Sequence, residues 1–535
     1  MRKEHLIIDE DSRETFVSYL LDLASRCLDF KVGSTFSRPP DSLRPDRIAE
    51  VSRIRESGQP LSDIIEEFAE DIASHSLNFG ASGFLAHPDN GIAMAAVLGD
   101  FARSLLNQNL VSHEYSPAAT RVEFELLQQL RRLTGFPMVE ESCDSVLQAG
   151  GAFVFGGTGA NLACLLAARE KLKLTLRQKG REYDPRRVRV LTKCPFAHYS
   201  LRRSILLLGL GNGDLTEAER ARLGLAADAR LDVATTNYVM DPADLERKIL
   251  QVHASGEDIL CVFAVAGDSR MMSFDSLRAI GDVCARHGVW LHVDACEGGQ
   301  CLFSPRRRHL FDGLELANSV SLDPHKVLML PYPLSAFFLR DQDDLGLIDI
   351  GTTVIRLGSS SFGTVTPAVG SKDFASLKLW FLLKHWGWRN IAAEIDRRHE
   401  LAKFAAALVR GSGELRLIND SVVHNAVAFM YCPDEIHQHW STSEINSLNQ
   451  LIHDTLNAKG RYFVHAMAAK DDNAVISQEK RDVTILRMMF GNPRTTEEDV
   501  SGCIDEVVRL GRAYASDPPW VEAEWNRAEL LATNG

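Results

Sequence analysis

Apolar side chains recur at helical spacing through the first part of the chain. Between residues 12 and 30 they include Phe16, Tyr19, Leu20, Leu23 and Cys27, a pattern that predicts an amphipathic helix. Residues 48–79 predict two more helices around a Gly-Gln-Pro turn. Such a segment has no core of its own, so we expect residues 1–95 to be helical and to pack on other parts of the molecule.

The pattern changes at about residue 120. Residues 122–137 predict a helix that ends in a glycine turn, and a glycine-rich turn then leads into a helix over residues 156–174. Short apolar runs follow at 187–193, 258–266, 288–295 and 333–341, and residues 273–287 form a helical pattern between two of them. Strands that alternate with helices predict an α/β domain with a mostly parallel sheet, placed at residues 96–385.

The pattern of apolar residues changes again near the carboxyl end. Residues 390–411 predict a long helix, 426–432 and 485–491 predict strands, and 497–515 predict a last helix. We expect residues 386–535 to form a smaller α+β domain. With 535 residues the chain is too long for one hydrophobic core, which agrees with this division.

Composition restricts the class of protein. The net charge of -13 argues against nucleic acid or an anionic membrane as the main partner. No apolar run reaches the roughly 18 residues of a membrane span, and the amino terminus has no signal-peptide core. The ten cysteines are scattered, and Cys296 and Cys301 lack the further ligands of a zinc site. We therefore expect a cytoplasmic protein without a metal centre.

Three features of the α/β domain carry candidate chemistry. Gly156–Asn161 is a glycine turn before a helix, where backbone N–H groups and the Thr158 hydroxyl can hold an anion; an ordinary strand–helix turn would look the same. Asp294 ends an apolar strand, where it can pair with a cation or serve as a structural carboxylate. Lys326 follows His325 and precedes apolar residues; a lysine in an apolar pocket loses its proton readily and can attack an aldehyde. Together the three suit a pyridoxal phosphate site.

The same motifs resemble those of the group II pyridoxal-phosphate-dependent amino acid decarboxylases. The resemblance covers most of the chain and follows the family's order. It is carried by SPAATRVEFELLQQLRRLTGFP, GGTGANLACLLAARE, AHYSLRRSILLLGLG, AGDSRMMSFDSLRAIGDVCARHGVWLHVDACEGG, SVSLDPHKVLMLP, SKDFASLKLWFLLKHWG and LRMMFGNPRTTEEDV. It implies a fold-type I enzyme that acts as a homodimer, with the helical amino-terminal segment packed on the partner and the active site at the interface.

The resemblance also implies roles for single residues. Lys326 binds the cofactor aldehyde, Asp294 pairs with the pyridine nitrogen, and His198 stacks on the ring near the substrate. The remaining cofactor-binding candidates are Gly157, Thr158, Ser269, Cys296 and His325, and the substrate-side candidates are His87 and Phe362. The implied reaction passes through an external aldimine and a quinonoid, and it releases CO2 and an amine from an L-amino acid.

Several positions depart from the family's pattern. The family's mobile loop usually carries a tyrosine that protonates the reacting carbon, but residues 341–374 contain neither tyrosine nor histidine. Ser371 and Lys372 lie where an arginine is common, Val327 replaces a tryptophan, and Asp268 is expected beside the cofactor edge. Two alternatives to an amine-forming decarboxylase therefore remain: decarboxylation with oxidative deamination to an aldehyde, or another cleavage at Cα. A cofactor-binding homologue without catalysis is a further alternative. The sequence leaves the substrate open.

Overall fold

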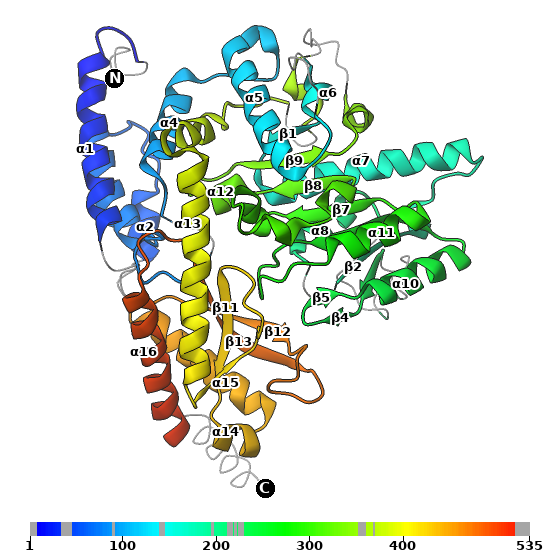
Figure 1. Cartoon of the computed structure of the whole chain (residues 1–535). Helices are drawn as coiled ribbons and strands as arrows, with labels where there is room; N and C mark the ends of the chain where they lie inside the picture. The colour runs from blue at the N-terminus through cyan, green and yellow to red at the C-terminus, as the bar shows by residue number, and fades with distance from the viewer. Residues whose placement is uncertain are drawn as a thin grey trace.

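In the computed structural model, two hydrophobic cores are joined by one long helix (Figure 1). The structure describes residues 8–33, 45–87, 91–138, 145–193, 197–210, 229–350, 360–366 and 370–518, with positions 218 and 222. The larger core lies around a central sheet, and the smaller core lies under the carboxyl-terminal helices.

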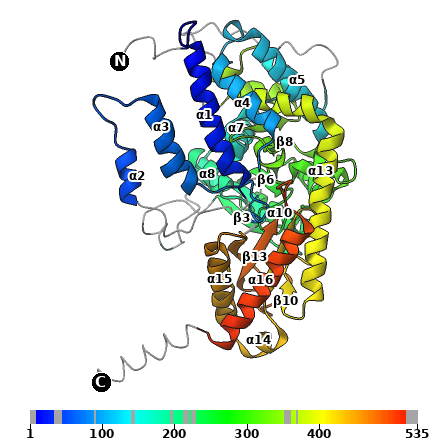
Figure 2. The ribbon, with the colours of Figure 1, turned by 90° about the vertical axis from the view of Figure 1, so that its left-hand side faces the viewer.

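The amino-terminal segment is helical, as its periodicity predicts. It contains α1 (Arg13–Val32), α2 (Pro45–Val51) and α3 (Leu61–Glu67), followed after a short irregular stretch by α4 (Met94–Leu106). Neither α1 nor α2 has a buried residue, and α2 and α3 stand apart from the large domain in Figure 2. Within this subunit the segment is attached through residues 78–87, where Leu85 exchanges backbone hydrogen bonds with Phe463 and Met489, and through α4, which packs on the long helix α13 (Leu377–Gly411).

The central sheet has seven strands in the order β1-β9-β8-β7-β6-β2-β3. The strands are β1 (Gly151–Val154), β2 (Val188–Lys193), β3 (Arg230–Val233), β6 (Asp258–Val265), β7 (Leu291–Ala295), β8 (Ser319–Leu322) and β9 (Ser335–Leu339). From β8 to β3 every pair is parallel, whereas β9 pairs antiparallel with both β8 and β1. The last of the four apolar runs is thus the antiparallel member. A mostly parallel sheet is what the alternation predicted.

Helices cover the central sheet. They are α5 (Pro117–Thr134), α6 (Val146–Ala149), α7 (Gly156–Gln178), α8 (Tyr199–Leu207), α10 (Pro242–Ala254), α11 (Leu277–His287) and α12 (Pro324–Val327), with a small hairpin of β4 (Thr235–Thr236) and β5 (Val239–Met240). Gly156 opens α7 with a φ of +69°, a conformation that favours glycine. The chain can therefore turn sharply from β1 into the helix.

The carboxyl-terminal domain is built on an antiparallel sheet. Its strands β10 (Leu415–Leu417), β11 (Ala426–Tyr431), β12 (His465–Lys470) and β13 (Asp482–Met489) take the order β10-β11-β13-β12. They are covered by α14 (Asp434–His439), α15 (Thr442–Ala458) and α16 (Glu497–Ser516). Helix α13 runs through the predicted boundary at 385/386 and bends there at Gly387, whose φ is +68°. Its first part packs on α4 and α5, and its second part packs on β10, β11 and α16.

Candidate active site

The candidate site lies where β7 and β8 end and α7, α8 and α12 begin. Asp294 is the fourth residue of β7, Lys326 lies in α12 after β8, and Gly157 and His198 lie at the starts of α7 and α8. The carboxyl ends of parallel strands and the positive ends of helices thus meet at one edge of the sheet, which is where ligands bind in such folds.

The Lys326 side chain is paired with a carboxylate. Its Nζ lies 2.9 Å from Oδ2 of Asp323, and the two side chains are 20% and 1% exposed. Burial lowers the pKa of Lys326, but the charges of Asp323 and Glu297 raise it, and the net pKa is well above its usual value. The interpretation of Lys326 as a lysine that loses its proton in an apolar pocket is therefore wrong for the free protein, because a carboxylate stands three residues before it.

Asp294 is buried and held by hydrogen bonds. Its Oδ2 accepts from Asn161 Nδ2 at 3.0 Å, and its Oδ1 accepts from the Cys296 N–H at 3.1 Å. Burial raises the pKa of Asp294, but His198, His292 and the Cys296 N–H lower it, and the net pKa is below its usual value. In the described parts of the chain no lysine or arginine nitrogen lies within ion-pair distance of it. This ionised carboxylate is therefore available to a cationic ring nitrogen.

Asn161 organises the surroundings of Asp294. Its Nδ2 donates to Asp294 and to Ser200 Oγ, and its Oδ1 accepts from Ser321 Oγ at 2.6 Å and from His292 Nε2 at 2.9 Å. One amide thus connects α7, α8, β7 and β8 around the carboxylate. The sequence analysis did not identify this role of Asn161. The available signal was its position, because Asn161 is the last residue of the glycine motif and lies one helical turn into α7.

His198 forms the start of α8. Its Nδ1 accepts from the Ser200 N–H at 3.2 Å, so the neutral ring carries its proton on Nε2. Burial lowers the pKa of His198, although Asp294 acts in the opposite direction. The ring is therefore neutral at neutral pH and presents Nε2–H as a donor.

The glycine turn lies directly against Asp323 and Cys296. A Cβ on Gly157 would lie 2.6 Å from Cys296 Sγ and 2.8 Å from Asp323 Oδ2, so no larger residue fits there. Thr158 follows in the first turn of α7, where helix N–H groups have no partner within the helix. His325 is buried beside Lys326 and donates from Nδ1 to the Leu334 carbonyl at 2.8 Å. The structure thus brings together the predicted turn, thiol, histidine and lysine.

These residues fit pyridoxal phosphate. The amine of Lys326 can hold the aldehyde, the carboxylate of Asp294 suits the ring nitrogen, and the first-turn N–H groups of α7, which have no partner within the helix, suit a phosphate. The neutral ring of His198 suits a stacking position beside the cofactor.

Ser269 and His87 lie near one buried arginine. Arg487 of β13 donates to the Ser269 carbonyl and to the Ala86 carbonyl, next to His87. The His87 ring lies 6.5 Å from the ring of His465. Arg487 was not singled out from the sequence, because an arginine inside an apolar strand gives no hint of two carbonyl partners hundreds of residues away.

Asp268, which the sequence placed beside the cofactor edge, is used in hydrogen bonds within its own turn. It is 2% exposed, and its carboxylate accepts from the N–H groups of Arg270, Met271 and Ser273 and from the Ser273 hydroxyl. All of its hydrogen-bonding capacity is used to hold the turn after β6. Asp268 is therefore a structural carboxylate that fixes the Ser269 backbone.

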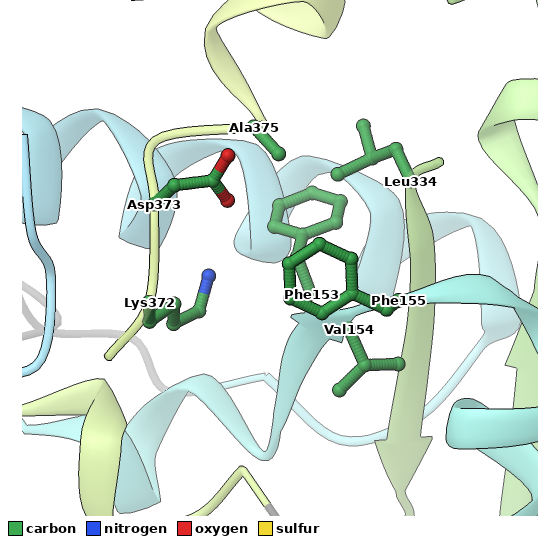
Figure 3. Close-up of a pocket in the computed structure, with 7 residues that line it drawn as sticks. All are labelled: Phe153, Val154, Phe155, Leu334, Lys372, Asp373 and Ala375. Atoms are coloured by element: carbon green, nitrogen blue, oxygen red, sulfur yellow. The ribbon is translucent and has the colours of Figure 1, made fainter. Parts of the chain in front are cut away.

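Phe362 and Lys372 lie together against α5. Phe362 is fully buried, with its ring 4.8 Å from that of Phe124 and 5.4 Å from Lys372 Nζ. Lys372 Nζ lies 2.5 Å from Glu123 Oε1, so the residue in the place of the family's arginine is used in a buried ion pair. Figure 3 shows Lys372 and Asp373 on the loop before α13, facing a pocket lined by Phe153, Val154, Phe155, Leu334 and Ala375. The substrate-side role of Phe362 stays a prediction.

Two further properties concern metal ligands and membrane-spanning helices. Over the described ranges, no three His, Cys, Asp or Glu side chains are grouped so that they could hold a metal ion. None of the helices in those ranges combines the length and apolar character needed to cross a bilayer.

Comparisons with known proteins agree with the site. The model of the pyridoxal-dependent decarboxylase conserved domain matches residues 42–432. An acidic amino acid decarboxylase of Bos taurus is 24% identical over 484 residues, which span 89% of this chain and 85% of that protein. The structure of Oryza sativa TDC with PLP and tryptamine has a TM-score of 0.79 at 20% identity, covering 95% of this chain and 99% of that one.

A Rhodiola rosea 4-hydroxyphenylacetaldehyde synthase has a TM-score of 0.74 at 16% identity, with 95% and 99% of the two chains covered. The architecture is that of fold-type I pyridoxal phosphate enzymes, as the sequence resemblance implied. Pyridoxal phosphate is the cofactor. With most of its length matched by the family model, this chain belongs to the pyridoxal-dependent decarboxylases, enzymes that remove the carboxyl group of amino acids.

Proposed function

We propose that this enzyme decarboxylates an L-amino acid at the site around Lys326 and releases CO2 and an amine. The observation that carries the proposal is the convergence of a lysine amine, a buried ionised carboxylate and a glycine turn that begins a helix at one edge of the sheet. When bound, pyridoxal phosphate supplies an electron sink that weakens the bonds at the substrate's Cα.

Four residues of the site have separate roles in this reaction. Lys326 would hold the cofactor through its aldehyde, and the ionised carboxylate of Asp294 would favour a positive charge on the ring nitrogen. Asn161 fixes the direction of that carboxylate. His198 would offer Nε2–H as a hydrogen-bond donor to the substrate, and only its protonated form could return a proton to Cα.

The source of this last proton decides the product. Residues 341–374 contain no tyrosine, so an amine-forming enzyme would need another acid, such as His198 or His87. The same absence favours the second candidate, in which the substrate is decarboxylated and then oxidatively deaminated to an aldehyde. The fold is shared by a tryptamine-bound protein and by an aldehyde synthase, so the fold does not distinguish the two outcomes.

We also propose that the enzyme is a cytoplasmic homodimer with the site at the subunit interface. Supporting this, the amino-terminal helices expose large apolar side chains, which is unusual for a surface that stays in water. They are Val17, Leu21, Leu28 and Val32 of α1, Leu61 and Ile64 of α3, and Met94, Val97 and Leu98 of α4.

A product assay tests the proposal. Purified enzyme with added pyridoxal phosphate is incubated with pooled amino acids, and CO2, amine, ammonia and peroxide are measured. CO2 with an amine supports the main proposal, and CO2 with ammonia and peroxide supports the aldehyde route. If none of these products forms, the result supports another cleavage at Cα or the non-catalytic alternative.

Lys326→Ala serves as the chemical control for that assay. Without the amine, borohydride should trap no cofactor on the protein, and turnover should be lost because no nitrogen holds the aldehyde. Mass spectrometry of the borohydride-treated protein checks the first point. Wild-type turnover in the variant would show that the site lies elsewhere.

A further inference from the structure

Asp323 occupies a position that the decarboxylation itself does not explain. It precedes α12, yet its side chain makes no capping hydrogen bond to that helix. Its Oδ1 instead accepts from Ser335 Oγ at 2.5 Å, and its Oδ2 lies 2.9 Å from Lys326 Nζ. A buried carboxylate is thus held against the nitrogen that must bond to the cofactor.

The same carboxylate lies against the anion-binding turn. Its two oxygens would be 2.8 and 3.0 Å from a Cβ on Gly157, so they adjoin the first turn of α7. A phosphate held by the N–H groups of that turn is therefore a neighbour of Asp323, and two neighbouring anions repel each other.

We propose that Asp323 restrains capture of the cofactor, by holding Lys326 as an ammonium ion and by placing negative charge beside the phosphate turn. Asp323 is a positioning residue, because it acts on the cofactor through Lys326 and through the anion site. Capture requires the ammonium to release one proton to solvent. The amine nitrogen then bonds to the aldehyde carbon, and one water leaves as the C=N bond forms. The Asp323 carboxylate opposes the release of the proton from Lys326 and repels the phosphate of the incoming cofactor.

The other groups around Lys326 do not replace Asp323. Glu297 and Cys296 follow β7, His198 begins α8, and His325 Nε2 lies 3.8 Å from the carboxylate. Glu297 is the second carboxylate that acts on the lysine, and it acts less strongly than Asp323. Burial by itself has the opposite effect, because it favours the neutral amine.

The experiment follows capture in protein stripped of its cofactor. The rate at which Lys326 becomes trappable by borohydride is measured against pH, with pyridoxal phosphate and with pyridoxal, which has an aldehyde but no phosphate. Asp323→Asn should shift the pH midpoint of both profiles down by about one to three pH units, the usual effect of an opposite charge on an ionisable group. In Asp323→Asn the capture rate should increase more for pyridoxal phosphate than for pyridoxal, because only pyridoxal phosphate carries a phosphate that the Asp323 carboxylate repels.

The control is an Asp–Lys pair elsewhere in the chain, in which the carboxylate is buried and the lysine is partly exposed. Asp344 is 8% exposed and lies 2.7 Å from Lys171. Lys171 is on α7, about 20 Å along the helix from Gly157 at roughly 1.5 Å per residue. Asp344→Asn should leave both profiles unchanged.

Several outcomes would overturn the proposal. One is an unchanged pH midpoint of capture in Asp323→Asn. Another is a midpoint shift in Asp344→Asn equal to that in Asp323→Asn. A third is an equal increase in capture rate for pyridoxal phosphate and pyridoxal in Asp323→Asn. If Asp323→Asn does not fold, the pH profile of capture in the wild-type protein tests the proposal. A midpoint above the roughly 10.4 of an unpaired lysine is expected, and a lower one would overturn the idea. No readout depends on turnover, so failure here is distinct from failure of the proposed decarboxylation.

Discussion

Asn161 offers a quantitative test of how the site is assembled. Asn161→Ala removes four hydrogen bonds, to Asp294, Ser200, Ser321 and His292. A buried neutral hydrogen bond contributes about 1 kcal/mol and one to a charged group about 1.5–3 kcal/mol. The sum is about 4.5–6 kcal/mol, and water that enters the space can restore part of it. We expect the free energy of unfolding to fall by about 3–5 kcal/mol.

Activity should fall as well, for a separate reason. Asp294 loses the donor that fixes its Oδ2 and can then tilt away from the ring nitrogen. A displacement of about 1 Å in such a site costs about 100-fold in turnover. The assay is kcat per molecule of bound cofactor, so that loss of folded or loaded protein does not count as loss of catalysis.

Asn449 provides the matched control. It is also fully buried, and it makes three hydrogen bonds to the backbone of Tyr431 and Ile445 in the small domain. Asn449→Ala should destabilise the protein by a comparable amount and leave kcat per bound cofactor unchanged. The reasoning is refuted if Asn161→Ala keeps wild-type kcat, or if Asn449→Ala loses as much kcat as Asn161→Ala does.

Two further predictions concern buried charges. Burial lowers the pKa of His292 to about 4, so below about pH 6.5 the unfolded chain binds a proton that the folded chain does not. The His292 contribution to stability should therefore fall by about 2 kcal/mol between pH 7.5 and 5. In urea unfolding the wild type should lose about 2 kcal/mol more than His292→Gln over this range, because the other buried histidines with lowered pKa values contribute to both proteins; equal losses would contradict the assignment. Lys372→Met strands the Glu123 carboxylate and should reduce the unfolding free energy by about 3–5 kcal/mol. Lys403→Met breaks the exposed pair with Glu400 and should change it by about 0.5 kcal/mol or less, and similar losses would refute the distinction.

Local signals in the sequence were sufficient for the main elements. The 3.6-residue period identified α5, α13 and α16, and short apolar runs identified β2, β6, β7 and β9, because burial of one face leaves a pattern in any sequence. The direction of β9 was not in that pattern. A buried run reads the same in a parallel and an antiparallel strand, and only its pairing with β1 and β8 fixes its direction.

The site shows the same division. Residue type and position alone determined that Gly157, Asp294 and Lys326 gather at one edge, because each stands at the end of a strand or the start of a helix. Only the tertiary structure decided the environment of each group. Asp294 is opposite Ser321 in the β7–β8 register, Asn161 reaches both from α7, and Asp323 turns the predicted neutral amine into a paired ammonium ion. Charge and protonation depend on distances of a few ångströms between segments far apart in the chain, and these distances exist only after the sheet and helices have packed.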